Sequence, residues 1–279
     1  MKDAMHITIS TDPILLEIGG VAILRWYSMA ITAAIFAAVW LIDREFKRKG
    51  MDTTHYGGIA AWTIVLGILG ARMFHVVDDW GFYSDNPGRI LQIQRGGLAI
   101  WGAVIVGAIG VYIGCRIYRI DFMKAIDAVA PGLVLAQAIG RIGNVVNGDA
   151  WGGPAGDAFF TFTYTNPDSY IPNELLNVRT HPYPIYDMAM NLLVFGLIWK
   201  LRKRPLPDGA LFMIFLVTYG IGRFFIHGWF RQEDIWLLGM QQAQFFSLVG
   251  AVAGLVGLAF LYYRSQATNG NPPAPEAAA

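Results

Sequence analysis

Residues 241–264 read QQAQFFSLVGAVAGLVGLAFLYYR, and this stretch decides the class of fold. Every residue from Leu248 to Tyr263 is apolar or glycine, so this part of the segment has no polar face. A helix of roughly 20 mostly apolar residues is long enough to cross the hydrocarbon core of a bilayer. The stretch therefore predicts a helix that spans a membrane.

Six other stretches have the same character in this chain of 279 residues, of which 55% are hydrophobic and 15% charged. The seven predicted spans are about 19–42, 57–77, 97–118, 122–147, 184–201, 209–228 and 241–264. We therefore expect an all-α polytopic membrane protein with a single seven-helix domain over residues 1–264.

Basic residues are distributed unevenly between the two sides of this arrangement. Twelve follow the odd-numbered spans: Arg44, Lys47, Arg48, Lys49, Arg116, Arg119, Lys124, Lys200, Arg202, Lys203, Arg204 and Arg264. Five lie on the opposite side: Lys2, Arg89, Arg95, Arg179 and Arg231. Because cytoplasmic loops carry the excess of Lys and Arg, the N-terminus is predicted outside and the C-terminus in the cytoplasm.

This topology places the longest connection, residues 148–183, outside as a small ordered cap between the fourth and fifth helices. Residues 265–279, rich in Asn, Pro and Ala, are expected to be a disordered cytoplasmic tail. The one cysteine, Cys115, excludes an internal disulfide, and no Cys/His spacing suggests a metal. We expect no cofactor, no nucleic-acid partner and no cleaved signal peptide.

Four arginines remain inside the predicted spans, all toward the outer leaflet: Arg25, Arg72, Arg141 and Arg223. An arginine at the centre of a membrane helix costs about 2.5 to 3.5 kcal/mol, so each needs a role that offsets this cost. A lipid phosphodiester is one such role, because guanidinium groups bind phosphate oxygens in a bidentate manner. Snorkelling to the interface or pairing with a carboxylate is the alternative, and it stays open above all for Arg25 and Arg72.

Arg141 lies in residues 140–149, GRIGNVVNGD, where two Asn and one Asp crowd the end of a helix. Such polar density is costly in lipid, so it predicts the floor of a water-accessible pocket.

That segment and the following AWG (150–152) resemble the signature of the prolipoprotein diacylglyceryl transferase family. Other segments resemble further motifs of the family in order: RWY (25–27), GAR (70–72), RGGLAIWG (95–102), HPYPIYD (181–187), and GRFFIH (222–227) with Phe230-Arg231. The similarity extends from about Asp12 to Arg264, and membership implies seven helices with the N-terminus outside.

The resemblance implies an enzyme of the bacterial inner (plasma) membrane, multi-pass, with its active site toward the outer leaflet. Family members move the diacylglyceryl group of phosphatidylglycerol onto the lipobox cysteine of a prolipoprotein, the first step of lipoprotein maturation. The products are a thioether and glycerol phosphate. The implied partners are phosphatidylglycerol, the lipobox peptide and membrane lipids.

By resemblance, Arg141 and Arg223 contact the phosphate. Residues expected around the lipid headgroup and the pocket are Tyr27, Trp101, Asn144, Asn147, Gly152, His181 and Tyr186. For Tyr27, a place in the interfacial aromatic belt is the alternative. Arg25 and Arg72 either steer the headgroup or anchor the protein, and for His181 a turn-forming role is the alternative.

Three residues depart from the family pattern. Trp101 stands where many members carry a histidine, Asp149 replaces the usual Glu, and His227 replaces a Glu of the sixth-helix motif. Trp101 cannot accept a proton. We therefore hypothesise that His227, which titrates in the range of physiological pH in its unperturbed form, takes part in proton transfer, with Asp149 orienting Arg141 or the headgroup. The alternatives are a structural role for His227 and activation of the thiol by nearby arginines and water, which lower the pKa of the thiol.

Two other functions remain open from the sequence. A transporter or flippase for anionic lipid would also use outer arginines, although no repeat or broken helix pair is evident. A catalytically inactive relative that still binds lipid would also explain the three departures.

Overall fold

A computed structural model describes residues 5–19, 21–93, 97–231 and 233–270. Within these residues, seven helices are long and apolar enough to cross a membrane, which confirms the predicted all-α fold with seven spans. They are α1 (Trp26–Arg48), α2 (Tyr56–Asp78), α4 (Ile100–Ile117), α5 (Phe122–Asn147), α6 (Tyr183–Leu201), α7 (Ala210–Phe230) and α8 (Gln242–Gly270). The orientation of the termini remains a prediction.

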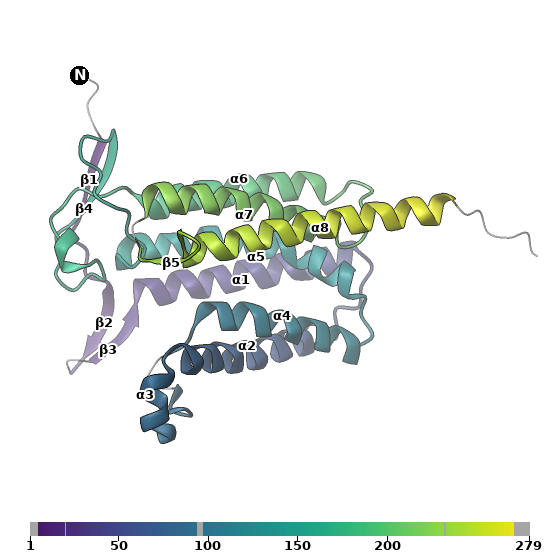
Figure 1. Ribbon diagram of the computed structural model, residues 1–279, viewed down its shortest axis with the longest axis horizontal. Coiled ribbons are helices and arrows are strands. Elements are labelled where there is room, and N and C mark those ends of the chain that lie inside the picture. The colour runs from purple at the N-terminus through teal and green to yellow at the C-terminus, as the bar shows by residue number, and fades with distance from the viewer. Residues whose placement is uncertain (1–4, 20, 94–96, 232, 271–279) are drawn as a thin grey trace, which may run out of the picture. The chain divides into compact units, whose positions relative to one another are not determined.

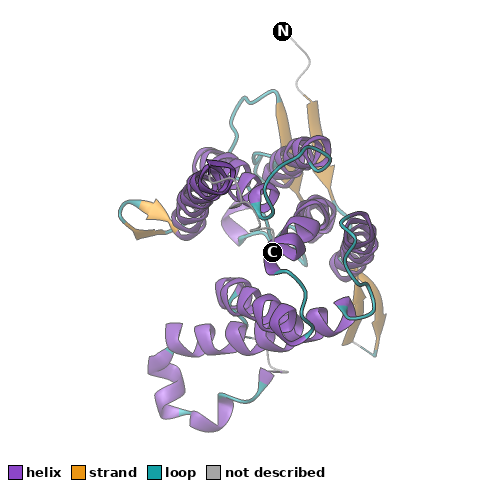
Figure 2. Cartoon of the chain, turned by 90° about the vertical axis from the view of Figure 1, so that its right-hand side faces the viewer, coloured by secondary structure: helices purple, strands orange, loops and turns teal. Residues whose placement is uncertain are grey.

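The smaller elements are short helices and three two-stranded sheets (Figure 2). The helices are α3 (Trp80–Asp85), η1 (Pro87–Arg89) and η3 (Asn173–Leu175). The strands are β1 (Met5–Ile9), β2 (Ile14–Ile18), β3 (Val21–Arg25), β4 (Phe160–Tyr164), β5 (Ile235–Leu237) and β6 (Met240–Gln241). β1 pairs with β4 in parallel, whereas β2–β3 and β5–β6 are antiparallel.

The predicted start of the first span, at residue 19, was wrong. Val21–Arg25 form β3, and the helix begins at Trp26. Gly19 has a positive φ of 61°, a conformation that suits the tight turn of an antiparallel hairpin. Arg25 therefore ends a strand opposite Ile14 and is not a residue inside a helix.

At the chain ends, residues 265–270 continue α8, so this part of the predicted tail is helical. Lys2, Arg95, Gly96 and residues 271–279 lie outside the described residues.

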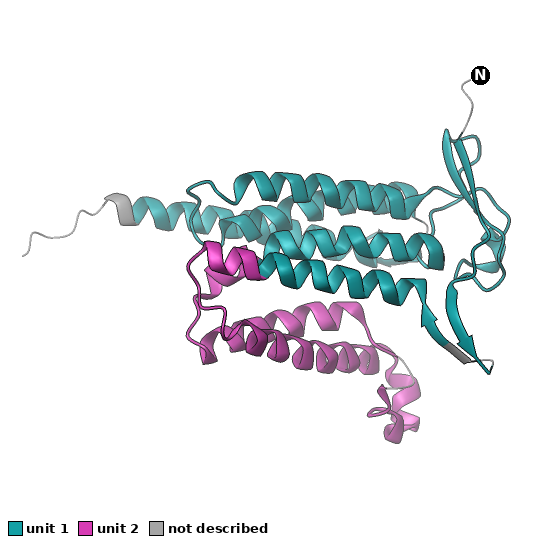
Figure 3. Ribbon diagram, turned by 180° about the vertical axis from the view of Figure 1, so that it is seen from behind, with its two compact units in different colours: residues 1–42, 129–279 teal, residues 43–128 magenta. Residues whose placement is uncertain are grey.

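The contacts group the chain into two compact units, residues 1–42 with 129–279 and residues 43–128 (Figure 3). In the first unit, α5, α6, α7 and α8 run side by side with α1 (Figure 1). A Cβ on Gly143 of α5 would lie 2.9 Å from Ala30 of α1, so a larger residue there would force the two helices apart. The centre of this unit is a cluster of buried side chains: Ala130, Val134, Met190, Val194, Ile198, Leu211 and Phe215.

The connection from α5 to α6 is ordered by a second hydrophobic cluster. Ile9 of β1 packs with Phe162 and Tyr164 of β4 and with Ile171. The Tyr164 hydroxyl donates to the carbonyl oxygen of Val145 at 2.9 Å, which ties the connection to the end of α5. Burial raises the pKa of this phenol, with a smaller contribution from Asp149.

The second unit depends on close approach of α2 and α4. Gly70 of α2 lies against the carbonyl of Gly102 and the side chain of Val106, so a Cβ there would collide with backbone. In the same unit, Lys49 Nζ donates to Asp127 Oδ2 at 2.9 Å, and both side chains are largely buried. Small residues thus let α2 and α4 pack closely, and the ion pair ties the segment after α1 to the start of α5.

Candidate active site

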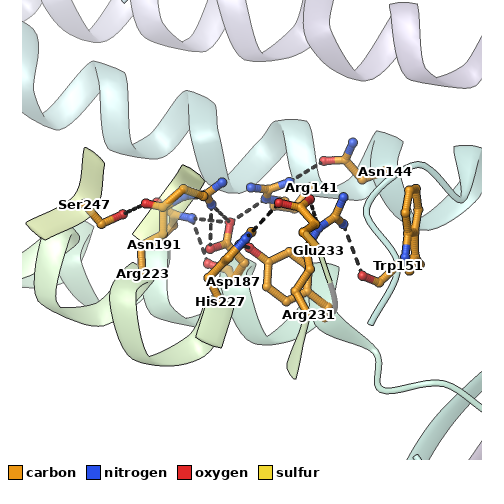
Figure 4. A network of polar contacts seen from close by, with 12 residues as sticks. Arg141, Asn144, Trp151, Asp187, Asn191, Arg223, His227, Arg231, Glu233 and Ser247 are labelled. Carbon is orange, nitrogen blue, oxygen red and sulfur yellow. Dashed lines mark hydrogen bonds and ion pairs between the residues drawn. The ribbon is translucent and has the colours of Figure 1, made fainter. Parts of the chain in front are cut away.

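A buried carboxylate joins two of the predicted arginines. Asp187 in α6 is 1% exposed and lies between Arg141 of α5 and Arg223 of α7 (Figure 4). Arg141 Nε donates to Asp187 Oδ2 at 2.5 Å, and Arg223 Nη1 lies 3.1 Å from Oδ1 and 3.3 Å from Oδ2. Three helices therefore bring three charges together, and we call these residues the arginine cluster.

The arginine cluster carries one more positive than negative charge. The side chains of Arg141 and Arg223 are 18% and 16% exposed, so neither guanidinium is fully covered by protein. A single carboxylate orients both groups without neutralising both. The cluster is thus suited to bind an anion such as a phosphate.

Polar side chains at the end of α5 extend from this cluster. Arg141 Nη1 donates to Asn144 Oδ1 at 3.0 Å, and Asn144 Nδ2 donates to Asp149 Oδ1 at 2.8 Å. Asp149 therefore acts on Arg141 through Asn144.

Two buried amide oxygens near these residues, Oδ1 of Asn147 and Oδ1 of Asn191, have no hydrogen-bond partner among the described residues. Asn191 belongs to the surroundings of Asp187, because its Nδ2 donates to the backbone oxygen of Asp187 at 2.7 Å. Unpaired buried acceptors are rare in folded proteins, so these two oxygens are candidates to accept from donors of a ligand.

A second network lies at the end of α7. His227, 2% exposed, has its Nδ1 3.0 Å from the Tyr183 hydroxyl and its Nε2 3.2 Å from Glu233 Oε2. Arg231 Nε donates to Glu233 Oε1 at 2.5 Å, and Arg231 Nη1 donates to the Trp151 carbonyl at 3.1 Å. The hydrogen bond from His227 and the positive charge of Arg231 lower the pKa of Glu233 to about 2, so this side chain is a carboxylate at neutral pH.

The two networks meet at Tyr183. The guanidinium carbon of Arg141 lies 5.8 Å from the centre of the Tyr183 ring, and that of Arg231 lies 5.5 Å from it. One tyrosine at the start of α6 thus contacts both the arginine cluster and the network of His227.

Other predicted site residues of the first unit lie where segments of the chain pack against each other. Tyr27 contacts Gly143, and Arg25 stacks over the ring of Tyr170 at 5.0 Å. Gly152 lies so close to the backbone of His181 that no side chain would fit there. Arg25 and Gly152 thus contact other residues of the protein. Their roles toward a lipid remain predictions.

His181 and Tyr186 pack against the same aromatic ring. The ring of Phe230 lies 5.1 Å from that of His181 and 4.6 Å from that of Tyr186. Burial lowers the pKa of His181, so its ring favours the neutral form.

Arg72 and Trp101 belong to the second unit. Arg72 is 6% exposed, and among the described residues it donates to the backbone carbonyls of Arg89, Ile90 and Gly97. This guanidinium therefore holds the connection between α2 and α4. Trp101 is half-buried in the first turn of α4. Lipid contacts of Arg72 and Trp101 remain predictions.

Comparison with known proteins agrees with the sequence motifs. The model of the family described as prolipoprotein diacylglyceryl transferase matches residues 13–260. The chain belongs to this family. Three similar bacterial proteins are each named phosphatidylglycerol–prolipoprotein diacylglyceryl transferase. The protein of Thermosynechococcus vestitus is 35% identical, covering 90% of this chain and 93% of the relative. That of a Nostoc species is 36% identical, covering 92% of each. That of Symbiobacterium thermophilum is 37% identical, covering 93% and 96%.

Family membership makes the chain a transferase by class, and both networks lie inside the matched range. Sequence reasoning assigned no site role to four members of them: Asp187, Tyr183, Arg231 and Glu233. Asp187 and Tyr183 were inside a quoted family motif, and a charged residue within a predicted span was the available signal for Asp187. Glu233 follows α7 in a short connection, where no sequence pattern indicates a contact with His227.

Proposed function

We propose that this chain transfers the diacylglyceryl group of phosphatidylglycerol to a cysteine thiol of a prolipoprotein, the first step of bacterial lipoprotein maturation. Family membership and the names of the similar proteins support the reaction and both substrates. The acceptor cysteine belongs to the lipobox of the prolipoprotein. Cys115 of this chain is buried at the end of α4 and is not that acceptor.

The observation that carries the proposal is the arginine cluster. In the reaction the thiol sulfur forms a bond to a glycerol carbon of the diacylglyceryl group, and the bond from that carbon to the phosphate oxygen breaks. Negative charge accumulates on the departing glycerol phosphate. Two guanidinium groups held by one carboxylate stabilise that charge in the transition state more than in the singly charged phosphodiester.

The polar end of α5 supplies further contacts for the headgroup. The amide oxygens of Asn147 and Asn191 accept hydrogen bonds from hydroxyl groups of the phosphatidylglycerol headgroup. Asn144 and Asp149 keep Arg141 in the orientation that faces the phosphate. Tyr27, which contacts α5 at Gly143, forms part of the pocket wall.

The seven apolar helices support a location in the bacterial plasma membrane, where both substrates are found. We place the site toward the outer leaflet because Arg141 and Arg223 come late in helices that run outward under the predicted orientation. Membrane lipids then surround the protein and reach the site laterally.

The proposal is tested with the purified protein, phosphatidylglycerol in mixed micelles and a lipobox peptide, whose mass is followed with time. A gain of one diacylglyceryl group on the cysteine, with release of glycerol phosphate, is the expected result. A peptide with serine in place of cysteine is the matched control and must not gain mass.

Two results would replace the proposal with another function. Retention of phosphatidylglycerol without any mass gain would indicate an inactive lipid-binding relative. Movement of labelled phosphatidylglycerol between the leaflets of proteoliposomes, without transfer to peptide, would indicate a flippase.

A further inference from the structure

The hydrogen bonds around His227 have a defined direction. The Glu233 carboxylate can only accept, so the proton on the His227 ring lies on Nε2, 3.2 Å from Glu233 Oε2. Nδ1 is then an acceptor, and the hydroxyl of Tyr183, 3.0 Å away, donates to it. The three residues form a chain in which a carboxylate orients an imidazole and the imidazole accepts from a hydroxyl.

We propose that Tyr183, His227 and Glu233 form the proton relay that removes the proton of the acceptor thiol. This inference rests on the transfer reaction proposed above. It assigns to this chain a base for a reaction whose nucleophile must become a thiolate. Trp101, at the position where many family members carry a histidine, has no basic nitrogen for that task.

The position of Tyr183 links the relay to the phosphate. Its ring lies beside Arg141 of the arginine cluster, so a thiol that attacks a lipid bound there approaches the phenol. Tyr183 and His227 are 1% and 2% exposed, which keeps water from the proton path. Entry of the substrates must therefore uncover the phenol before the proton can move.

The proton and electron count closes without another reactant. The thiol proton passes to Tyr183 Oη while the phenolic proton passes to His227 Nδ1. The sulfur electron pair forms the bond to carbon, and the carbon–oxygen bond breaks with its electron pair on glycerol phosphate. The imidazolium then returns the proton through Tyr183 to the departing glycerol phosphate, which resets the relay.

Among the described residues, charged and titratable groups of several segments lie near His227. They are Tyr183 and Asp187 on α6, Arg223 on α7, and Arg231 and Glu233 after α7. Glu233 Oε2 accepts the hydrogen bond from Nε2 of the ring at 3.2 Å. It is therefore a positioning residue, which fixes the tautomer of His227 and balances the imidazolium.

The relay is tested by the pH dependence of kcat/KM for transfer to the lipobox peptide. Near pH 7, H227Q and Y183F should lose at least about 100-fold, the usual contribution of a general base, and E233Q should lose about tenfold. As the pH rises toward about 8.5, where a free thiol ionises by itself, H227Q and Y183F should recover toward the wild-type rate. R223Q should not recover at high pH, because this variant keeps the base and lacks a group that contacts the phosphate.

Matched controls come from the same chain. D234N changes the acid next to Glu233 on the same connection, and H6Q changes a histidine on β1, so both should keep the wild-type profile. Retained phosphatidylglycerol and an unchanged unfolding temperature show that the relay variants fold. If one variant does not fold, the remaining two carry the test.

A second substrate separates the relay from a structural role. A selenocysteine peptide carries a selenol that is ionised at neutral pH and needs no base, so relay variants should transfer to it as fast as the wild type. The relay is overturned if H227Q and Y183F match the wild-type pH profile, or if they lose activity equally with both peptides. Absence of product with the wild type at every pH would instead contradict the proposed function itself.

Discussion

Asp187 carries a single negative charge between two guanidinium groups, and replacing it with asparagine leaves both without their ion partner. Removal of one partner of a largely buried ion pair costs about 3 kcal/mol or more, so D187N should unfold at lower denaturant concentration than the wild type. It should also lose most transfer activity, because Arg141 and Arg223 are no longer oriented. D168N, on the exposed part of the α5–α6 connection, is the control, and wild-type stability of D187N would contradict this role.

His181 provides a prediction about pH. Its folded pKa is below the ordinary value of about 6.5 because the ring is buried, so the unfolded chain binds a proton more readily. The stability that His181 contributes is therefore complete above about pH 6.5 and declines as the pH falls through the folded pKa. H181F keeps an aromatic ring against Phe230 and should remove that part of the decline. Thermal unfolding of both proteins from about pH 7.5 to pH 5 measures the difference; parallel curves would contradict the prediction.

The sequence identified the arginines of the site but not their pairing. Arg141 and Arg223 were predicted because charges inside apolar spans need a role, and both belong to the observed cluster. Their shared partner, Asp187, comes from a third helix, and hydropathy contains no information about which helices are neighbours. For Arg72 the same reasoning left a lipid contact and a plain anchoring role open, and the structure adds backbone carbonyls as acceptors of its guanidinium, which hydropathy does not indicate.

At the scale of elements, all seven spans could be predicted because length and apolar content alone decide them. The start of α1 could not be predicted, because the apolar residues 21–24 are compatible with either a strand or a helix. The short strands and α3 were missed because elements of two to six residues are too short to give a hydropathy signal.

Helix packing gives a prediction at this scale. A Cβ on Gly70 would collide with the backbone of α4, so G70A should destabilise the protein by about 1 to 3 kcal/mol. At Gly250 of α8 a Cβ would meet no described atom within 4 Å, so G250A is the matched control. G250A should be neutral or slightly stabilising, because alanine favours a helix by up to about 1 kcal/mol over glycine. Equal unfolding curves for the two variants would show that close approach of α2 and α4 is unimportant.

For the whole molecule, the sequence predicted one membrane domain over residues 1–264, and contacts group the described residues into two compact units. The predicted orientation can be tested with cysteine labelling, since Cys115 is the one native cysteine and is readily replaced. In a C115A background, D168C should react with a membrane-impermeant maleimide in intact cells. K203C should react only after the membrane is opened. The reverse pattern would place the site toward the cytoplasm.

The central claim is that Arg141 and Arg223 together stabilise the phosphate that leaves during diacylglyceryl transfer. The most direct measurement is the rate of peptide modification by R141Q and R223Q at saturating phosphatidylglycerol, with R179Q, an exposed arginine of the α5–α6 connection, as control. We predict a loss of at least about 100-fold in kcat for both variants, the usual effect of removing one group that stabilises transition-state charge, and no loss for R179Q. Wild-type kcat in either R141Q or R223Q would contradict the claim.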